Sequence, residues 1–147
     1  MSEQGRPDRR SPPPSGMAAP RSAPGPDGRE LDLVDLAGRV CARYYEEHPD
    51  EDARYGEVGR AWCLHDNQHL LNWTALAAEG LADLDREVAW LARVLDRRRF
   101  PLDRLARDLE LGGEVLAEQV PDSATLTAAL DRACAMVRNR SFPTEHA

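Results

Sequence analysis

One short segment of the chain, residues 62–73, concentrates the side chains that could bind a ligand or take part in catalysis. It holds two of the three tryptophans, two of the four histidines and one of the three cysteines, together with an aspartate. On a helix, residues three and four positions apart lie on the same face. The spacing therefore predicts one row of side chains along a helix: Trp62, His65, Asp66, His69 and Trp73. Such a row could line a ligand pocket, or it could pack as an ordinary part of the core.

Metal binding is the first chemistry to consider for this row. His65 and His69 are four positions apart, a spacing that can place two imidazoles on one ion, and Asp66 could supply a third ligand. The chain has neither an H-E-x-x-H arrangement nor the repeated Glu-x-x-His of helical di-iron proteins. We therefore predict no metal site.

Nucleophilic catalysis is the second. Cys63 and His65 are two positions apart, so the thiol and the imidazole point away from each other on a helix. The sequence offers no strand-turn-helix elbow to expose a nucleophile and no glycine-rich phosphate loop. The acidic residues recur mostly at positions expected to face solvent. We therefore predict that the protein is not an enzyme.

The elements that must position these residues are expected to be helices. Apolar residues recur at helical spacing from residue 30 to about residue 140, and β-branched residues are few. The predicted helices cover residues 31–47, 52–78, 83–98, 102–119 and 123–140. In the second helix, Tyr55, Val58 and Leu76 are expected to extend the row of rings into one inward stripe. Gly56 and Gly59 either weaken its first turns or permit close packing.

The ends of the chain differ from this helical body. Seven of the eleven prolines fall in residues 1–29, which contain almost no large apolar side chain. Such a segment cannot bury enough surface to offset its ordering entropy. The sequence therefore predicts a disordered tail over residues 1–29, one helical domain over residues 30–140 and a short C-terminal tail over residues 141–147.

Charge and cysteine content narrow the function further. The formal net charge is −7, and an acidic body argues against non-specific nucleic-acid binding. The run Arg97, Arg98 and Arg99 is expected to complement a helix C-terminus. Three widely spaced cysteines fit a reducing compartment, and no stretch is apolar enough to span a membrane. A cytoplasmic protein with no membrane or nucleic-acid partner is expected.

A family resemblance adds to this interpretation. The run Cys63-Leu64-His65-Asp66, followed by Leu71 and by Gly80 before another helix, resembles the chromophore-bearing stretch of phycobiliproteins. The segment from Arg54 to Arg60 also looks like a helical module of bacterial cobalamin-binding regulatory proteins. The phycobiliprotein resemblance implies a globin-like helical bundle. It also implies a thioether position at Cys63 and a pyrrole-nitrogen partner at Asp66. His65 stands where that family has an arginine, which removes a permanent bidentate cation.

Two functions follow as hypotheses. The first is a small non-enzymatic regulatory or sensory module that binds a tetrapyrrole, whether bilin, heme or cobalamin. Its cofactor-binding residues would be Trp62, Cys63, His65, Asp66, His69 and Trp73. The alternative is a protein–protein interaction adaptor without a small-molecule ligand, which meets a regulatory protein or a second copy of itself.

Overall fold

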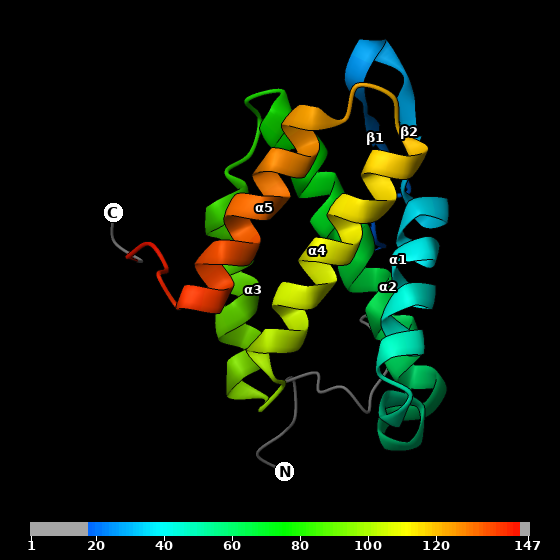
Figure 1. Ribbon diagram of the computed structural model, residues 1–147, viewed down its shortest axis with the longest axis vertical. Helices are drawn as coiled ribbons and strands as arrows, with labels where there is room; N and C mark the ends of the chain where they lie inside the picture. The colour runs from blue at the N-terminus through cyan, green and yellow to red at the C-terminus, as the bar shows by residue number, and fades with distance from the viewer. Residues whose placement is uncertain (1–17, 145–147) are drawn as a thin grey trace.

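The computed structural model describes residues 18–144, and five helices make up most of that range. A hairpin comes first, formed by β1 (Ser22–Pro24), a 3-10 turn at Pro26–Gly28 and β2 (Glu30–Asp32). The helices are α1 (Leu33–Glu47), α2 (Asp50–Ala78), α3 (Leu84–Arg97), α4 (Leu102–Gln119) and α5 (Ala124–Asn139), as Figure 1 shows. The all-α class predicted from the sequence is confirmed, and a globin-like arrangement of the helices stays a prediction.

Local signals in the sequence set several helix ends. The side chains of Asp32 and Asp83 accept hydrogen bonds from backbone amides three positions ahead, at Asp35 (3.1 Å) and Arg86 (3.3 Å). They cap the first turns of α1 and α3, which leaves fewer amides without partners. Gly80 follows α2 with a φ of +75°, a left-handed conformation that glycine adopts without strain.

One glycine interrupts α2 from within. At Gly56 the φ angle is 61° and the ψ angle is −150°, a region that essentially only glycine adopts. The turn before it carries Glu51, whose side chain is buried although it is acidic. Gly59 permits close packing, because an added Cβ there would lie 2.4 Å from Tyr55 Cβ and 3.3 Å from Tyr45 Oη. The two glycines therefore shape the start of α2 differently.

The helices pack around one apolar core. α4 makes its most extensive contact with α5, and α1 packs on both α2 and α4. In Figure 1, α4 and α5 lie side by side, with α3 behind α5 and α2 behind α4. Most of the largest fully buried side chains are leucines and valines of α1, α3, α4 and α5, whereas α2 contributes Thr74. No helix between residues 18 and 144 combines the length and the apolar character needed to cross a bilayer.

The hairpin corrects the predicted extent of the N-terminal tail. Residues 18–29 carry β1 and the turn, so the described part of the chain is ordered before residue 30. Ala23 pairs with Leu31 across the hairpin and both are buried, while Gln68 Nε2 donates to the Pro20 carbonyl (2.9 Å). The predicted tail was too long because the prediction rested on proline-rich composition. Composition does not show that Ala23 reaches the core through strand pairing. Residues 1–17 lie outside the described residues.

The C-terminal boundary can be compared only in part. Residues 141–144 follow α5 without helix or strand, as the sequence predicts, and Phe142 packs partly against the core. Residues 145–147 lie outside the described range.

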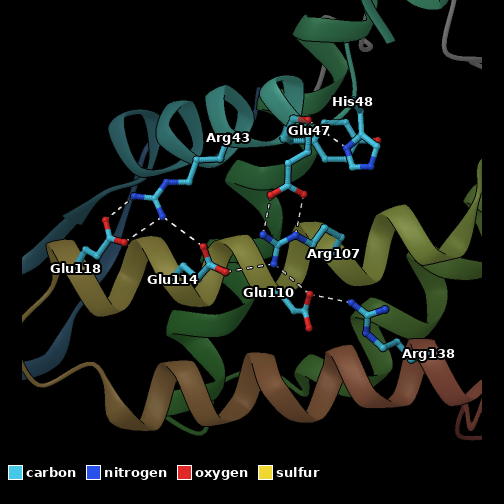
Figure 2. A network of polar contacts seen from close by, with 9 residues as sticks. Arg43, Glu47, His48, Arg107, Glu110, Glu114, Glu118 and Arg138 are labelled. Carbon is cyan, nitrogen blue, oxygen red and sulfur yellow. Dashed lines mark hydrogen bonds and ion pairs between the residues drawn. The ribbon is translucent and has the colours of Figure 1, made fainter. Parts of the chain in front are cut away.

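Ion pairs join α1, α4 and α5 along one surface (Figure 2). Three arginines alternate there with four glutamates: Arg43, Arg107, Arg138, Glu47, Glu110, Glu114 and Glu118. Arg107 lies 2.6 Å from Glu47, and its hydrogen bonds hold the pKa of that carboxyl below the ordinary value. Because these side chains are partly exposed, water and salt screen each pair, and its net contribution to stability is small. The network therefore connects the exposed sides of α1, α4 and α5.

Candidate functional site

The rings of the predicted row lie on α2 in the expected order. Ring centroids are 5.4 Å apart for Trp62 and His65, 4.7 Å for His65 and His69, and 5.8 Å for His69 and Trp73. The angles between successive ring planes are 79°, 61° and 40°. These are edge-to-face or tilted contacts, the arrangement that ring quadrupoles favour. The rings therefore pack on one another and do not stand as parallel walls of a flat slot.

The row lies on the flank of α2 and not on its core-facing side. The centre of the buried side is formed by Cys63, Asn67, Leu70 and Thr74. These residues are displaced from the row by about one position, which is roughly 100° around a helix. The expected inward stripe is therefore wrong in direction.

The exposure of individual residues agrees with this rotation. His65, His69 and Trp73 are only partly buried, and so are Tyr55, Val58 and Leu76 at the ends of the expected stripe. Trp62 is the exception, at 5% exposure. Polar residues hold core-facing positions instead because their hydrogen bonds are satisfied there. Thr74 Oγ1, for example, donates to the Leu70 carbonyl (2.7 Å).

The centre of the row carries an imidazole beside a carboxylate. His65 Nδ1 lies 3.2 Å from Asp66 Oδ1, and the two side chains are 20% and 15% exposed. Burial lowers the pKa of His69, and the charge of His65 lowers it further, while Asp66 acts in the opposite direction. His69 is therefore biased toward its neutral form. The Asp66 carboxylate already interacts with the neighbouring His65, so it is not held ready for a ligand alone.

Cys63 points away from the rings and toward the inside of the bundle. The residue is 8% exposed, and Asn67 Nδ2 donates to its backbone carbonyl (3.0 Å) and to its Sγ (3.5 Å). The Cys41 thiol raises the pKa of Cys63 well above its ordinary value, and burial raises it further. Because the thiolate is the reactive form, this position disfavours both nucleophilic attack and thioether formation.

A small cavity lies beside Cys63, between α1, α2, α3 and α4. Charged and polar side chains line it together with apolar side chains of α3 and α4: Tyr44, Glu51, Asp66, Asn67, Arg104, Asp108, Leu91, Leu95 and Leu105. Its volume is about 30 Å³. That is room for about one water, whereas pockets for drug-sized ligands span roughly 300–1,000 Å³. A tetrapyrrole does not fit this space beside Cys63 and Asp66.

The polar groups around the cavity satisfy one another. Tyr44 Oη donates to Glu51 Oε2 (2.6 Å), and Arg104 Nη1 donates to the same oxygen (2.8 Å). Asn67 Nδ2 also donates to Asp108 Oδ1 (3.1 Å). Burial, then the bond to Glu51, raise the pKa of the Tyr44 hydroxyl far above its ordinary value. No buried side-chain nitrogen or oxygen of residues 18–144 lacks a partner. The cluster therefore links α1, α2 and α4.

Of the charged residues around this cavity, Asp66 was predicted from the sequence, whereas Glu51, Arg104 and Asp108 were not. Asp108 gave a usable signal, because it lies between Leu105 and Leu109 in the apolar row of α4. Glu51 and Arg104 gave none. They are 53 positions apart in the chain and meet only in the folded protein.

The remaining potential metal ligands and the third tryptophan do not add to this site. Within the described residues, no group of three or more His, Cys, Asp or Glu side chains is arranged to hold a metal ion. Trp90, the third tryptophan, lies on the outer side of α3 and is 53% exposed. It therefore belongs to a surface separate from the ring row on α2.

Known proteins do not assign the chain to a family. Protein-family models, curated proteins and solved structures were all searched, and none matches. The resemblance to phycobiliproteins therefore stays a prediction, carried only by the residues quoted for it.

Proposed function

We propose that the protein is a non-enzymatic regulatory module that acts by binding another protein, without a small molecule in its interior. The observation that carries this proposal is the interior cavity of about 30 Å³ beside Cys63 and Asp66. Its polar groups are engaged with each other, and its thiol is buried with a raised pKa. An interior of this kind favours a structural role for the cluster. The partner protein would then bind to the outer faces of the helices.

A tetrapyrrole sensor is the second candidate, and the half-buried rings of α2 favour it. Indole and imidazole groups are suitable walls for a flat ligand, and His65 and His69 are partly exposed. The ligand would then lie along the outer side of the Trp62–Trp73 row and not in the cavity.

Photo-crosslinking in the source organism tests the first proposal. A photoreactive amino acid is placed at one exposed position on each helix, at Ala42, Ala61, Trp90, Ala117 or Ala135. We expect a discrete crosslinked protein from at least one of these positions, and a circular dichroism spectrum unchanged from the parent protein. The absence of a discrete product from all five positions would refute the proposal.

An absorption titration separates the two candidates. The purified protein is titrated with hemin, biliverdin and hydroxocobalamin in turn. The interaction proposal predicts no saturable spectral change with any of them. A stoichiometric Soret or bilin band that is lost in a His69→Phe variant would instead support the sensor.

A further inference from the structure

The outer face of α3 differs from the rest of the surface. Arg86, Trp90, Arg93 and Arg97 recur at intervals of four, three and four residues, so they share one side of the helix. The core-facing side is formed by Leu84, Val88, Leu91 and Leu95. Trp90 is therefore not needed for the core, and more than half of its surface is exposed. We call these four residues the α3 arginine–tryptophan face.

A hollow of about 280 Å³ lies on this face. Val94 and the four face residues line it, together with Pro143 and Thr144 of the segment after α5. None of its lining residues in the described part of the chain is acidic, although acids outnumber arginines by 26 to 19 overall. The hollow thus offers an indole surface within a positively charged rim.

Arg86 and Arg97 differ in their pairing from three arginines on the other helices. On α1, α4 and α5, Arg43, Arg107 and Arg138 are held by glutamates (Figure 2). Among the ion pairs of residues 18–144, none includes Arg86 or Arg97. Both guanidinium groups therefore keep their bidentate donors available for a carboxylate from outside.

The larger neighbouring hollow is a weaker candidate. It measures about 680 Å³ and lies between the start of α3 and the end of α5. Asp83 and Asp85 line it together with Arg86 and Arg132, so acids and bases are mixed there. Charged residues of both signs therefore line this hollow, whereas every charged residue that lines the hollow on the α3 arginine–tryptophan face is an arginine.

We propose that the α3 arginine–tryptophan face binds an acidic segment of a partner protein. Carboxylates of that segment pair with Arg86 and Arg97, and an apolar side chain covers Trp90. Tryptophan and arginine are the residues most enriched among energetic hot spots of protein interfaces. At 1.5 Å rise per residue, the two arginines lie about 16 Å apart along the helix, with Trp90 between them. An acidic segment with a central apolar residue matches this order. The inference rests on the proposed interaction function and names the surface and the partner chemistry.

The test uses the full chain and a defined peptide. The probe is a fluorescein-labelled peptide of alternating glutamate and leucine, and its counterpart has glutamine in place of glutamate. We expect saturable binding of the glutamate peptide, weakened as salt rises, and at least tenfold weaker binding of the glutamine peptide. Bound unlabelled peptide should also protect Trp90 from acrylamide quenching.

Matched variants connect this binding to the surface. Arg86→Gln/Arg97→Gln should raise the Kd for the glutamate peptide at least tenfold. Arg39→Gln/Arg54→Gln, which removes the same charge from exposed positions on α1 and α2, should change it less than twofold. Trp90→Ala should weaken binding without removing its salt dependence. Equal effects of the two double variants would overturn the inference.

Other occupants give different outcomes, and each would overturn it. These outcomes are binding of a phosphoserine peptide, an oligodeoxythymidylate or phosphatidylserine vesicles but not of the glutamate peptide, and a dimer in light scattering that buries Trp90. Crosslinks from Ala42, Ala61, Ala117 or Ala135 but never from Trp90 would also overturn it, while leaving the proposed interaction function intact.

Discussion

Replacing Arg104 with methionine should leave the buried Glu51 carboxylate without its arginine partner, with the Tyr44 hydroxyl as its remaining donor in the Tyr44–Glu51–Arg104 group. Breaking a buried ion pair costs about 3–5 kcal/mol, and one charge-assisted hydrogen bond about 1.5–3 kcal/mol. The side chain of Glu51 is 5% exposed, but that of Arg104 is 24% exposed, so water can partly replace the lost donor. The exposed Asp50, 3.0 Å from Arg104, adds little, because water and salt screen that pair. We therefore expect a loss of about 2–4 kcal/mol, near the lower end of the buried range.

Urea unfolding followed by circular dichroism at pH 7 measures this loss. Methionine has a helix propensity close to that of arginine, so the backbone of α4 should be little affected. The decisive comparison is the double variant Arg104→Met/Glu51→Gln. Removing the buried charge should recover at least about 1 kcal/mol relative to Arg104→Met alone, because a neutral amide is cheaper to bury than a carboxylate.

Two results would refute this reasoning. One is a loss below about 1 kcal/mol in Arg104→Met, which would mean that Glu51 is well solvated. The other is a double variant less stable than Arg104→Met, which would mean that the Glu51 charge is not the source of the cost.

Three further predictions concern backbone, protonation and thiol reactivity. Gly56→Ala should destabilise the protein by about 1–3 kcal/mol, because the backbone conformation at Gly56 disfavours a side chain even though no atom would clash with it. Gly38→Ala, at an exposed helical position, should instead stabilise the protein by about 0.5–1 kcal/mol. Equal effects of the two variants in urea unfolding would contradict the role of the Gly56 backbone. The pKa of His69 lies below its ordinary 6.5, so the folded state binds the proton more weakly than the unfolded state does. The stability of the folded state should therefore fall as the pH drops below 6.5. His69→Phe should reduce this dependence on pH in urea titrations between about pH 7 and about pH 5. Iodoacetamide should modify Cys63 far more slowly in the native protein than in urea, and more slowly than it modifies the partly exposed Cys41. Equal rates for Cys63 and Cys41 in the native protein, measured by peptide mass spectrometry, would contradict the burial and raised pKa of Cys63.

Much of the helical framework could be predicted because its signals are local. Apolar residues at helical spacing mark the buried sides of α1, α3, α4 and α5, and capping residues such as Asp32 and Asp83 mark where helices begin. The ring contacts from Trp62 to Trp73 also follow from spacing alone, because one helix carries them all. The amino-acid sequence therefore determined which side chains touch within an element.

Only the tertiary structure decided which side of α2 faces the core and which residues contact that side. α2 turns Cys63, Asn67 and Thr74 inward and leaves the rings on its flank, because the other helices cover that side and satisfy its polar groups. The pairing of Glu51 with Arg104, and of Ala23 with Leu31, joins segments that have no local reason to meet. Burial energy is gained by the whole packed set of helices at once, so it can place the Glu51 carboxylate inside where local spacing gives no sign of it.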